Sequence, residues 1–390
     1  MLYADIFWFN SLILRFLLVL LRSQSTRMKN FKFFSIFLYL IVFSCVSSTK
    51  NNNSESQNQP KFAIAIHGGA GTILKSQMSD SLEAAYIEVL SKAVSAGHDI
   101  LSKGGSALDA VGASINILED SPLFNAGKGA VFTHDQTNEL DASIMDGATL
   151  NAGAVAGVMH IKNPIDLARS VMDNSPHVFM YGQGAEAFAK DQGFALVEQD
   201  YFYTQSRYDH LMRVKAAEEQ HSLLLDKKSP MNNQAEMFFD PILKASKYGT
   251  VGCVALDQNG NLAAGTSTGG MTNKQFGRIG DAPVIGAGTY ANNQSCAVSA
   301  TGWGEYFIRG VVAHDISAMM QYGGFDLEQS TSTVIDKKIP ELGGDGGVIA
   351  MDKHGNISMR FNTPGMYRAQ IDSNGALKVG IYKSDTLLTK

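Results

Sequence analysis

One threonine of this chain stands where a nucleophile could be made. The segment Gly249-Thr250-Val251-Gly252 follows a polar stretch and opens an apolar run. A threonine hydroxyl needs a base to remove its proton, and a free α-amine, with an unperturbed pKa of about 7.7–8.0, is close enough to neutrality to serve. A cut before Thr250 would expose the hydroxyl and create this base together, and the preceding glycine leaves the carbonyl open to attack. Alone, the tetrapeptide equally fits a structural threonine at the start of a strand.

Further small and polar residues follow Thr250 in three dense segments. They read TSTGGMTNK at 266–274, GRIGDAP at 277–283 and ATGWGE at 300–305. Arg278 and Asp281 are three residues apart, so a turn or short helix can direct both side chains into one pocket. Arginine suits a carboxylate as a two-point donor, and aspartate supplies the counter-charge for an ammonium. A local ion pair between the two is the structural alternative at this spacing.

The elements that must position these residues are strands and helices. An apolar run at 62–66 predicts a buried strand that stops at a glycine-rich turn, HGGAG at 67–71. Apolar residues at helical spacing predict a helix over 82–102, and Ser106 is a candidate N-cap for a second helix that ends near residue 119. Shorter helices are expected at 164–173 and 184–190.

Two segments, separated by 95 residues, resemble each other. They read VALDQNGNLAAGTS from Val254 and IAMDKHGNISMRFN from Ile349, and each predicts a β-hairpin. Antiparallel hairpins and helices without a regular βαβ alternation predict an α+β fold. The polar stretch at 222–248 has little periodicity and predicts a mobile loop that leads to Thr250.

Composition narrows the class of protein. The chain has 390 residues, 45% of them hydrophobic, and a formal net charge of −5, which is ordinary for a globular enzyme. The body after residue 60 is acidic and has no basic stripe, which argues against a nucleic-acid partner. The cysteines Cys45, Cys253 and Cys296 lie far apart, and we expect the last two to be buried free thiols. His67, His134, His160 and His177 lack metal-ligand spacing and are expected to be structural.

Residues 1–60 differ from the rest and predict a leader. A thirteen-residue apolar run from Phe33 to Cys45 follows two lysines, which suits a secretory signal with Met28 as a candidate start. Cys45 either is lipidated, as after a loose bacterial lipobox, or is incidental in a cleaved signal, and an uncleaved anchor is a third possibility. The polar tract that follows is expected to be a disordered tether. The sequence therefore predicts an exported protein, periplasmic or tethered to the membrane as a lipoprotein.

Taken together, the ordered motifs carry a family resemblance. HGGAG at 67–71, NAGKGAVFT at 125–133, ELDASIMDG at 139–147, GTVG at 249–252, TSTGGMTNK at 266–274, GRIGDAPVIGAGTYA at 277–291 and ATGWGE at 300–305 resemble the plant-type L-asparaginases, or isoaspartyl peptidases, which are threonine peptidases of the N-terminal-nucleophile hydrolase superfamily. The resemblance covers about 61–385.

The resemblance implies a fold and a maturation step. The family fold is a four-layer αββα sandwich, and its members cut themselves at a bond that corresponds to Gly249–Thr250. An α chain at 61–249 and a β chain at 250–390 would result, and the family pattern is a dimer of such αβ units. The implied substrates are L-asparagine and β-aspartyl dipeptides, with release of L-aspartate.

The resemblance also implies roles for single residues. Thr250 corresponds to the nucleophile and Thr268 to the threonine that polarises it. Thr301, through its hydroxyl, and Gly302, through its backbone N–H, correspond to the oxyanion donors. The substrate-binding positions and the residue that orients the cleavage site are Arg278, Asp281, Gly302, Gly304 and Asn125. Trp303 replaces a smaller residue common in relatives, which adds bulk beside the pocket.

The chemistry implied by the resemblance requires no cofactor. A structural sodium ion is expected in the loop at 118–128, where the backbone carbonyls of the family bind it. The corresponding residues here are Leu118, Glu119, Ser121, Phe124, Ala126 and Lys128.

Rival functions remain to be weighed against this one. A glycosylasparaginase shares several of the motifs, but its nucleophile usually follows aspartate, and here Gly249 precedes Thr250. A taspase-like endoprotease is disfavoured for the same reason. A non-catalytic surface binding module would be indicated by loss of Thr250, Thr268, Arg278 or Thr301, all of which are present.

Overall fold

The computed structural model describes residues 61–225, 249–385 and 388–389, with side chains described at 61–220 and 249–385. The expected leader at 1–60 lies outside these residues. So does nearly all of the expected loop at 222–248. Its first four residues are described, and they form the end of a helix, α7 (Gln205–Leu225), so the irregular segment begins later than the polar composition predicts.

The larger of two sheets has nine strands in the order β13-β12-β11-β1-β5-β6-β2-β3-β4. Neighbouring strands are antiparallel except for β3 and β4. The strands are β1 (Ala63–Gly71), β2 (Leu140–Asp146), β3 (Ala152–Val158), β4 (Phe179–Tyr181), β5 (Val251–Leu256), β6 (Leu262–Thr268), β11 (Gly365–Ile371), β12 (Leu377–Tyr382) and β13 (Leu388–Thr389).

The smaller sheet has four antiparallel strands in the order β10-β9-β8-β7. They are β7 (Thr289–Ala291), β8 (Cys296–Gly302), β9 (Gly346–Asp352) and β10 (Ile357–Phe361). Both expected hairpins are confirmed, as β5–β6 and β9–β10. They belong to different sheets, which their similar sequences do not reveal.

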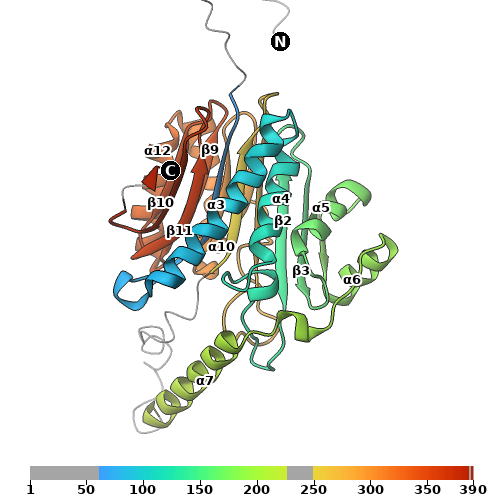
Figure 1. The fold of residues 1–390 in the computed structure, drawn as a ribbon, viewed down its shortest axis with the longest axis vertical. Coiled ribbons are helices and arrows are strands. Elements are labelled where there is room, and N and C mark those ends of the chain that lie inside the picture. Colours follow the sequence, from blue (N-terminus) through green and yellow to red (C-terminus); the bar gives the residue numbers. More distant parts are fainter. Residues whose placement is uncertain (1–60, 226–248, 386–387, 390) are drawn as a thin grey trace, which may run out of the picture. The chain divides into compact units, whose positions relative to one another are not determined.

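The helices group with one sheet or the other. Those before Thr250 are α3 (Asp80–Ser102), α4 (Ala107–Glu119), α5 (Pro164–Asn174), α6 (Gly182–Asp191) and α7, and those after it are α10 (Gly304–Gly310), α11 (Val312–Gly323), α12 (Leu327–Thr333) and α13 (Ile339–Leu342). Ser106 caps α4 as expected, because its hydroxyl accepts a 3.1 Å hydrogen bond from the Asp109 N–H. Figure 1 shows α3 and α4 lying across the strands of the larger sheet, and α7 pointing away from them.

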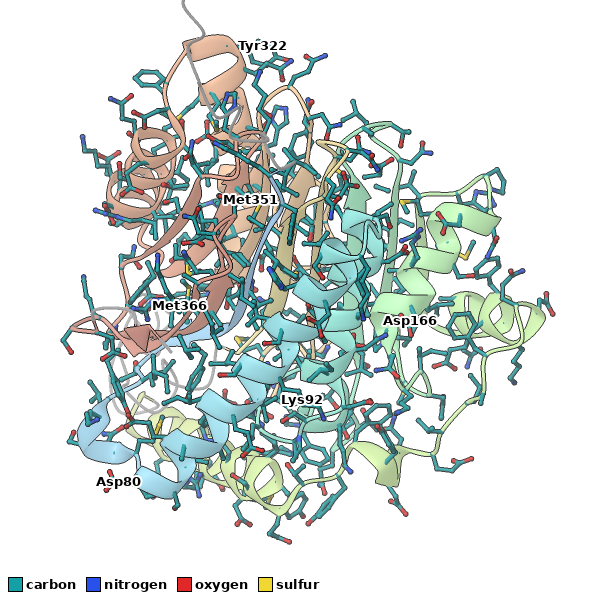
Figure 2. All side chains as sticks on the ribbon, turned by 45° about the horizontal axis from the view of Figure 1, so that its top comes forward. Asp80, Lys92, Asp166, Tyr322, Met351 and Met366 are labelled. Carbon is teal, nitrogen blue, oxygen red and sulfur yellow. The ribbon has the colours of Figure 1, made fainter. Side chains whose placement is uncertain are left out.

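Three hydrophobic clusters hold these elements together. One joins α3, α4 and α5 to the larger sheet, and another joins the smaller sheet to α10, α11 and α12. The third lies between the sheets and includes Met351 of β9 and Met366 of β11, both fully buried. Figure 2 shows these methionines among the C-terminal strands, with Asp80 and Lys92 out on α3. The α+β class predicted from the sequence is therefore confirmed.

Strand β1 differs from the expectation in a way that matters for the site. It does not stop at His67 but continues through the glycine-rich segment to Gly71, with an irregularity in its pairing between His67 and Ala70. Gly69 has φ +109, a conformation that favours glycine, so the irregularity depends on this residue. The glycine-rich motif is thus the end of a central strand and not a loop beyond it.

Candidate active site

Thr250 and Thr268 meet at one end of two neighbouring strands. Thr250 immediately precedes β5 and Thr268 ends β6, and the register pairs Val251 with Ser267. The Thr250 hydroxyl donates a 3.1 Å hydrogen bond to the Thr268 hydroxyl, which also accepts one of 3.0 Å from the Gly270 N–H. Both threonines are buried. The Thr250 oxygen is therefore held in one orientation, with a hydroxyl ready to polarise it.

The peptide bond before Thr250 is contacted by Asn125 and by Gly69. The Gly249 carbonyl accepts a 3.2 Å hydrogen bond from the backbone N–H of Asn125. Gly249 has φ +141, and a Cβ there would lie 2.7 Å from the Asn125 Cβ. A Cβ on Gly69, from the glycine-rich end of β1, would lie 2.6 Å from the Gly249 Cα. Only glycine fits at either position.

The side chain of Asn125 fixes the loop that carries this N–H. Its amide nitrogen donates to the Gly270 carbonyl at 2.7 Å, and its amide oxygen accepts from the Val131 N–H at 2.9 Å. The resemblance implied that Asn125 orients the bond before Thr250, and in the structure Asn125 adjoins this bond. The contact to the Gly249 carbonyl comes from its main chain, which no side-chain pattern could indicate. A small cavity of about 140 Å³ opens beside this bond, lined in part by Gly69, Asn125 and Gly249.

Thr301 and Gly302 end β8, on the strand of the smaller sheet that approaches the glycine-rich segment. The Thr301 hydroxyl accepts a 3.3 Å hydrogen bond from the Ala70 N–H, which leaves its own proton available for donation. A Cβ on Gly302 would lie 2.5 Å from the Phe307 ring, so close packing requires glycine here. These two residues can supply the pair of donors that an oxyanion needs.

Arg278 is not paired with Asp281, which was the structural alternative. It makes a two-point ion pair with Glu305, with Nε to Oε1 at 2.9 Å and Nη2 to Oε2 at 2.8 Å. A Cβ on Gly304 would lie 2.8 Å from Arg278 Nη2 and 3.0 Å from the Asp281 N, so this glycine lets the arginine approach. Glu305 belongs to the ATGWGE motif, but nothing in the sequence assigned it a role. Its neighbour Trp303 is buried and packs edge-on against Tyr306, with ring centroids 4.8 Å apart.

Asp281 is buried, and one oxygen of its carboxylate, Oδ2, has no hydrogen-bond partner among the residues that the structure describes. Burial raises the pKa of Asp281 to about 7, and nearby Arg278 only partly opposes this rise. A buried carboxylate without a partner is unfavourable, and a bound cation would relieve it. The local chemistry suits an ammonium group beside the guanidinium of Arg278.

A second buried carboxylate, Asp141, adjoins the site. It ends up opposite Thr268 in the register of β2 and β6. One oxygen accepts from the Gly157 N–H at 2.9 Å, and the other has no partner. Burial raises the pKa of Asp141, while Lys274 and Arg278 oppose the rise. Asp141 lies within the ELDASIMDG motif that contributes to the family resemblance, but the sequence predicted no role for it.

The His67 ring contacts the main chain of Thr250. Its Nδ1 lies 3.0 Å from the Thr250 carbonyl oxygen and its Nε2 lies 3.0 Å from the Ser299 hydroxyl. Burial lowers the pKa of His67 to about 3, so the ring is neutral near pH 7. Because a carbonyl only accepts, Nδ1 carries the proton, and Nε2 accepts from Ser299.

The Ser299 hydroxyl begins a buried chain that crosses between the sheets. Ser299 lies 2.7 Å from the Thr266 hydroxyl, Thr289 donates to Thr266 at 2.6 Å, and Ser143 donates to Thr289 at 2.8 Å. All four hydroxyl-bearing residues are fully buried. Thr289, Thr266 and Ser299 can each donate one proton along the chain towards His67, while the single proton of Ser143 is shared between Thr289 and the Ala282 carbonyl, 2.6 Å away. The sequence expectation that His67 is structural is thus refined, since its ring orients the main chain of Thr250.

The loop at 118–128 is tightly folded, with two glycines against backbone carbonyls. A Cβ on Gly127 would lie 2.4 Å from the Glu119 carbonyl oxygen, and one on Gly129 would lie 2.1 Å from that of Phe124. Uncharged carbonyls suit a hard monovalent cation. Within the described part of the chain, no group of three or more His, Cys, Asp or Glu side chains could hold a metal ion. Cys253 and Cys296 are buried free thiols, as expected.

Comparison with known proteins shows the family to which a chain with this fold and these threonines belongs. Residues 60–381 match the asparaginase family, and this chain belongs to it. It is 52% identical over 332 residues to the isoaspartyl peptidase of Escherichia coli (strain K12), covering 85% of this chain and 99% of that protein.

More distant relatives agree with this assignment. A probable isoaspartyl peptidase/L-asparaginase 2 from Arabidopsis thaliana is 43% identical over 330 residues, which cover 83% of this chain and 99% of the relative. A plant-type L-asparaginase from Thermococcus kodakarensis is 40% identical over 311 residues, which cover 78% and 94%. The family resemblance stated from the motifs is therefore confirmed.

The expected export, as a periplasmic protein or a membrane-tethered lipoprotein, is wrong. The family match begins at residue 60, and 85% of this chain accounts for 99% of the Escherichia coli relative. The leader on which the expectation rested is thus no part of what the relatives share, and it lies outside the described residues. Among residues that the structure does describe, no helix is both long and apolar enough to cross a membrane.

Proposed function

We propose that this protein cuts its own chain before Thr250 and then uses the freed threonine to hydrolyse L-asparagine and isoaspartyl (β-aspartyl) dipeptides, with release of L-aspartate. One observation carries the proposal. The Thr250 hydroxyl is hydrogen-bonded and buried beside a Gly249 carbonyl that already accepts an N–H. A nucleophile and a polarised carbonyl thus occupy adjacent residues.

The cleavage proceeds by attack of Thr250 Oγ1 on the Gly249 carbonyl carbon. The Asn125 N–H stabilises the oxygen that becomes negative, and the Thr268 hydroxyl, which lies 3.1 Å from Thr250 Oγ1, orients the nucleophile. The C–N bond breaks, the nitrogen takes up the proton that Thr250 Oγ1 has lost and becomes the α-amine, and an ester joins Gly249 to the threonine oxygen. Water then hydrolyses the ester, which leaves a carboxylate on Gly249 and a free Thr250.

The freed α-amine is the base for the second reaction. It takes the proton of Thr250 Oγ1 as this oxygen attacks the side-chain carbonyl of the substrate, and then protonates the departing ammonia or amine. The Thr301 hydroxyl and the Gly302 N–H hold the oxyanion, and each such donor typically contributes about 2.7–4 kcal/mol to the barrier reduction. Water releases L-aspartate from the acyl-enzyme and restores the threonine.

Substrate capture follows from two opposite charges. Arg278 holds the α-carboxylate and Asp281 the α-ammonium, while the backbone at Gly304 lies against both. Glu305 keeps the guanidinium of Arg278 in a fixed orientation before substrate arrives. Preorganisation of this kind lowers the entropy lost on binding.

The same proposal extends to the architecture and the mature chains. The three hydrophobic clusters support a four-layer αββα sandwich. Cleavage would yield an α chain at 61–249 and a β chain at 250–390, and we propose that two αβ units form a dimer. Light scattering of the processed protein tests the dimer, since a mass of one αβ unit would refute it.

We also propose that the 118–128 loop holds a structural sodium ion through its backbone carbonyls. The close packing of the Glu119 carbonyl against Gly127, and of the Phe124 carbonyl against Gly129, supports it. Replacement of sodium by a large organic cation such as tetramethylammonium would then lower the melting temperature. An unchanged melting temperature in sodium-free buffer would contradict this site.

The proposed activity is tested by assaying three substrates side by side. L-Asparagine and a β-aspartyl dipeptide should release L-aspartate, and an asparagine bearing N-acetylglucosamine on its side-chain nitrogen should not be cleaved at a comparable rate. Arg278→Lys keeps the charge but loses the two-point geometry, and it should raise KM for both substrates. Preference for the glycosylated substrate would instead support the alternative, a glycosylasparaginase, which the names of the relatives disfavour.

A further inference from the structure

A separate cavity of about 390 Å³ opens between the edge strand β10 and strand β11. Ile357, Met359 and Phe361 alternate along β10, pack towards the cluster between the sheets and form its apolar wall. Arg368 and Gln370 line it from β11, alternating with Ala369, which packs on the helix side of the larger sheet. The cavity therefore lies between the two sheets, apart from Thr250.

Arg368 is the unusual member of this lining. Arg368 is 4% exposed, yet no carboxylate of the described chain lies within ion-pair distance of its guanidinium. Two of its five N–H groups donate to backbone carbonyls, those of Met366 at 3.0 Å and Tyr382 at 3.2 Å. Its guanidinium also lies 4.9 Å from the centre of the Phe361 ring. Within the described part of the chain the other three N–H groups have no recorded acceptor, which leaves them for a ligand.

Two further groups around the cavity have unused hydrogen-bonding capacity. Gln370 is 9% exposed, and its side-chain amide makes no hydrogen bond to any residue the structure describes. Lys383 stands exposed at the rim, without an ion pair in the described chain. A buried guanidinium, an unused amide and a rim ammonium all face one space, which favours an anion with oxygen acceptors.

The charged residues around the cavity limit the negative charge that a bound anion can carry. Arg360 also lines the cavity, but Asp336 and Glu328 neutralise it through hydrogen bonds to Nε at 2.7 Å and Nη1 at 3.2 Å. Its positive charge is therefore not available to a ligand.

Near the remaining charges, Asp385 offsets one of the two cations. Burial lowers the pKa of Arg368, and the carboxylate of Asp385 partly reverses this at longer range. That carboxylate is itself held by the N–H groups of Ile381 and Tyr382, each at 2.8 Å. Counted together, the cations Arg360, Arg368 and Lys383 are balanced by Asp336, Glu328 and Asp385, so the surroundings carry no net positive charge and suit a monoanion better than a dianion such as phosphate.

We propose that this cavity is a binding site for a small monocarboxylate with an apolar ring or chain. The carboxylate binds the free N–H groups of Arg368 and the amide of Gln370, with Lys383 above it. The apolar part lies against Met359 and Phe361. The cavity is separate from the candidate active site, and the two are linked only through the sheet, where Arg368 pairs with His67 in the register of β1 and β11.

Isothermal titration calorimetry with benzoate tests the proposal on the full processed protein. We expect saturable binding of one benzoate per αβ unit. Benzamide, its uncharged analogue, should bind at least about tenfold more weakly, because a charge-assisted pair is lost. Arg368→Met keeps the apolar stem and should weaken benzoate binding by at least about tenfold. Lys92→Met, on α3 across the larger sheet (Figure 2), should have no effect.

Two more variants keep the test decisive if Arg368→Met does not fold. Lys383→Met and Gln370→Met each remove one ligand-facing group, and each should weaken benzoate binding about threefold or more. Arg278→Met should leave benzoate binding unchanged, which separates this cavity from the substrate clamp. The proposal is overturned if benzamide binds as tightly as benzoate, if Lys383→Met and Gln370→Met both bind normally, or if Arg278→Met abolishes binding.

Discussion

At the scale of single residues, Asp281 shows how the site is prepared for a charged substrate. Its Oδ2 is buried without a partner, while Arg278, the nearby cation, is already engaged by Glu305. The site therefore holds a carboxylate with one unsatisfied oxygen at the position where we propose that the substrate ammonium binds. Burying such a group is unfavourable until the ligand completes it, so part of the binding energy comes from relieving this state.

This arrangement predicts the pH dependence of substrate capture. Asp281 must be ionised to hold an ammonium, and its pKa is raised to about 7 in the free protein. The affinity for L-asparagine should rise as the pH rises through about 7 and then level off. KM measured from pH 5.5 to 8 checks this. Asp281→Asn should raise KM at least about tenfold and remove the rise, whereas Asp315→Asn, in a surface ion pair with Lys338, should leave both unchanged.

Most of the residues that would contact substrate could be predicted from the sequence, because they sit in short motifs that keep their spacing. Residues of this kind, which would act through their side chains, are Thr250, Thr268, Thr301 and Arg278. The contribution of Asn125 through its backbone N–H could not be predicted in that way, since any residue has an N–H and only the fold aims it. The two-point pairing of Arg278 with Glu305, 27 residues away, is likewise a property of the tertiary structure.

At the scale of elements, the site depends on strand ends held in register. Strands β5 and β6 bring Thr250 to Thr268, while β1 and β8 bring the glycine-rich segment to Thr301. The His67 ring and the hydroxyl chain behind it cross from the larger sheet to the smaller one. The relative position of the two sheets is therefore fixed by polar contacts as well as by the apolar cluster between them.

Removing one link of this chain should disturb catalysis more than its stability effect suggests. Ser299→Ala deletes the donor to His67 Nε2 and leaves that nitrogen unsatisfied, at a cost of about 1–3 kcal/mol in the free energy of unfolding. We expect kcat to fall several-fold, since the ring no longer orients the Thr250 carbonyl. The matched control is Ser295→Ala, just before β8, which breaks a buried 2.6 Å hydrogen bond to the Ser317 hydroxyl. Equal kcat in the two variants, at equal loss of stability, would contradict the positioning role.

Glu119 joins three elements and makes their packing sensitive to pH. At the end of α4, its carboxyl accepts hydrogen bonds from Ser267 of β6 at 2.6 Å and from the Ile165 N–H of α5 at 3.1 Å. Burial raises the pKa of Glu119 from 4.5 to about 8. Between these two values the folded state retains a proton that the unfolded chain has lost, so stability falls as the pH rises from about 4.5 to 8.

A neutral replacement should remove this dependence. Glu119→Gln should become more stable relative to the wild type as the pH rises through that range, by about 1.4 kcal/mol for each unit of the pKa difference at most. Urea unfolding at pH 5 and pH 8 measures the change, and the exposed Glu88→Gln serves as control. A difference between the variant and the wild type that is the same at both values would refute the raised pKa.

The sequence predicted the elements with strong local signals, namely β1, the helices α3 to α6 and the two hairpins, but not the remaining strands and helices or all the limits. Periodicity and the Ser106 cap located α3 and α4 because these signals are local. It placed the end of β1 at His67, since glycines usually mark a turn, whereas pairing with β5 and β11 extends this strand. The helix α7 was not foreseen, because its apolar residues follow no clear stripe and its contacts are to distant loops, such as Arg207 to the Gly129 carbonyl.

At the scale of the whole molecule, the two proposed chains are interleaved within one sheet. Strand β1 of the proposed α chain lies between β11 and β5 of the β chain, and β6 of the β chain pairs with β2 of the α chain. Such an order could not be predicted from the sequence, because the hairpins show only local pairing. It follows that a cut before Thr250 breaks one bond but no layer of the fold.

The interleaving predicts that the fragments stay together after cleavage. Separation would expose the edges of β1, β5, β6 and β2 and the hydrophobic clusters behind them, which is strongly unfavourable. The processed protein should elute from a sizing column as one species in buffer and should separate into two chains only in denaturant. Dissociation of the fragments in dilute buffer would contradict this account of the sheet.

The central claim is that Thr250 is released by the chain itself, and intact mass spectrometry with N-terminal sequencing tests it most directly. Residues 61–390 are purified and incubated beside a Thr250→Ala variant. We expect two wild-type fragments, one of which begins at Thr250, with release of L-aspartate from L-asparagine only after the cut, and an uncut, inactive variant. A wild-type chain that stays whole while it hydrolyses L-asparagine, or a variant that is cut at the same bond, would contradict the account.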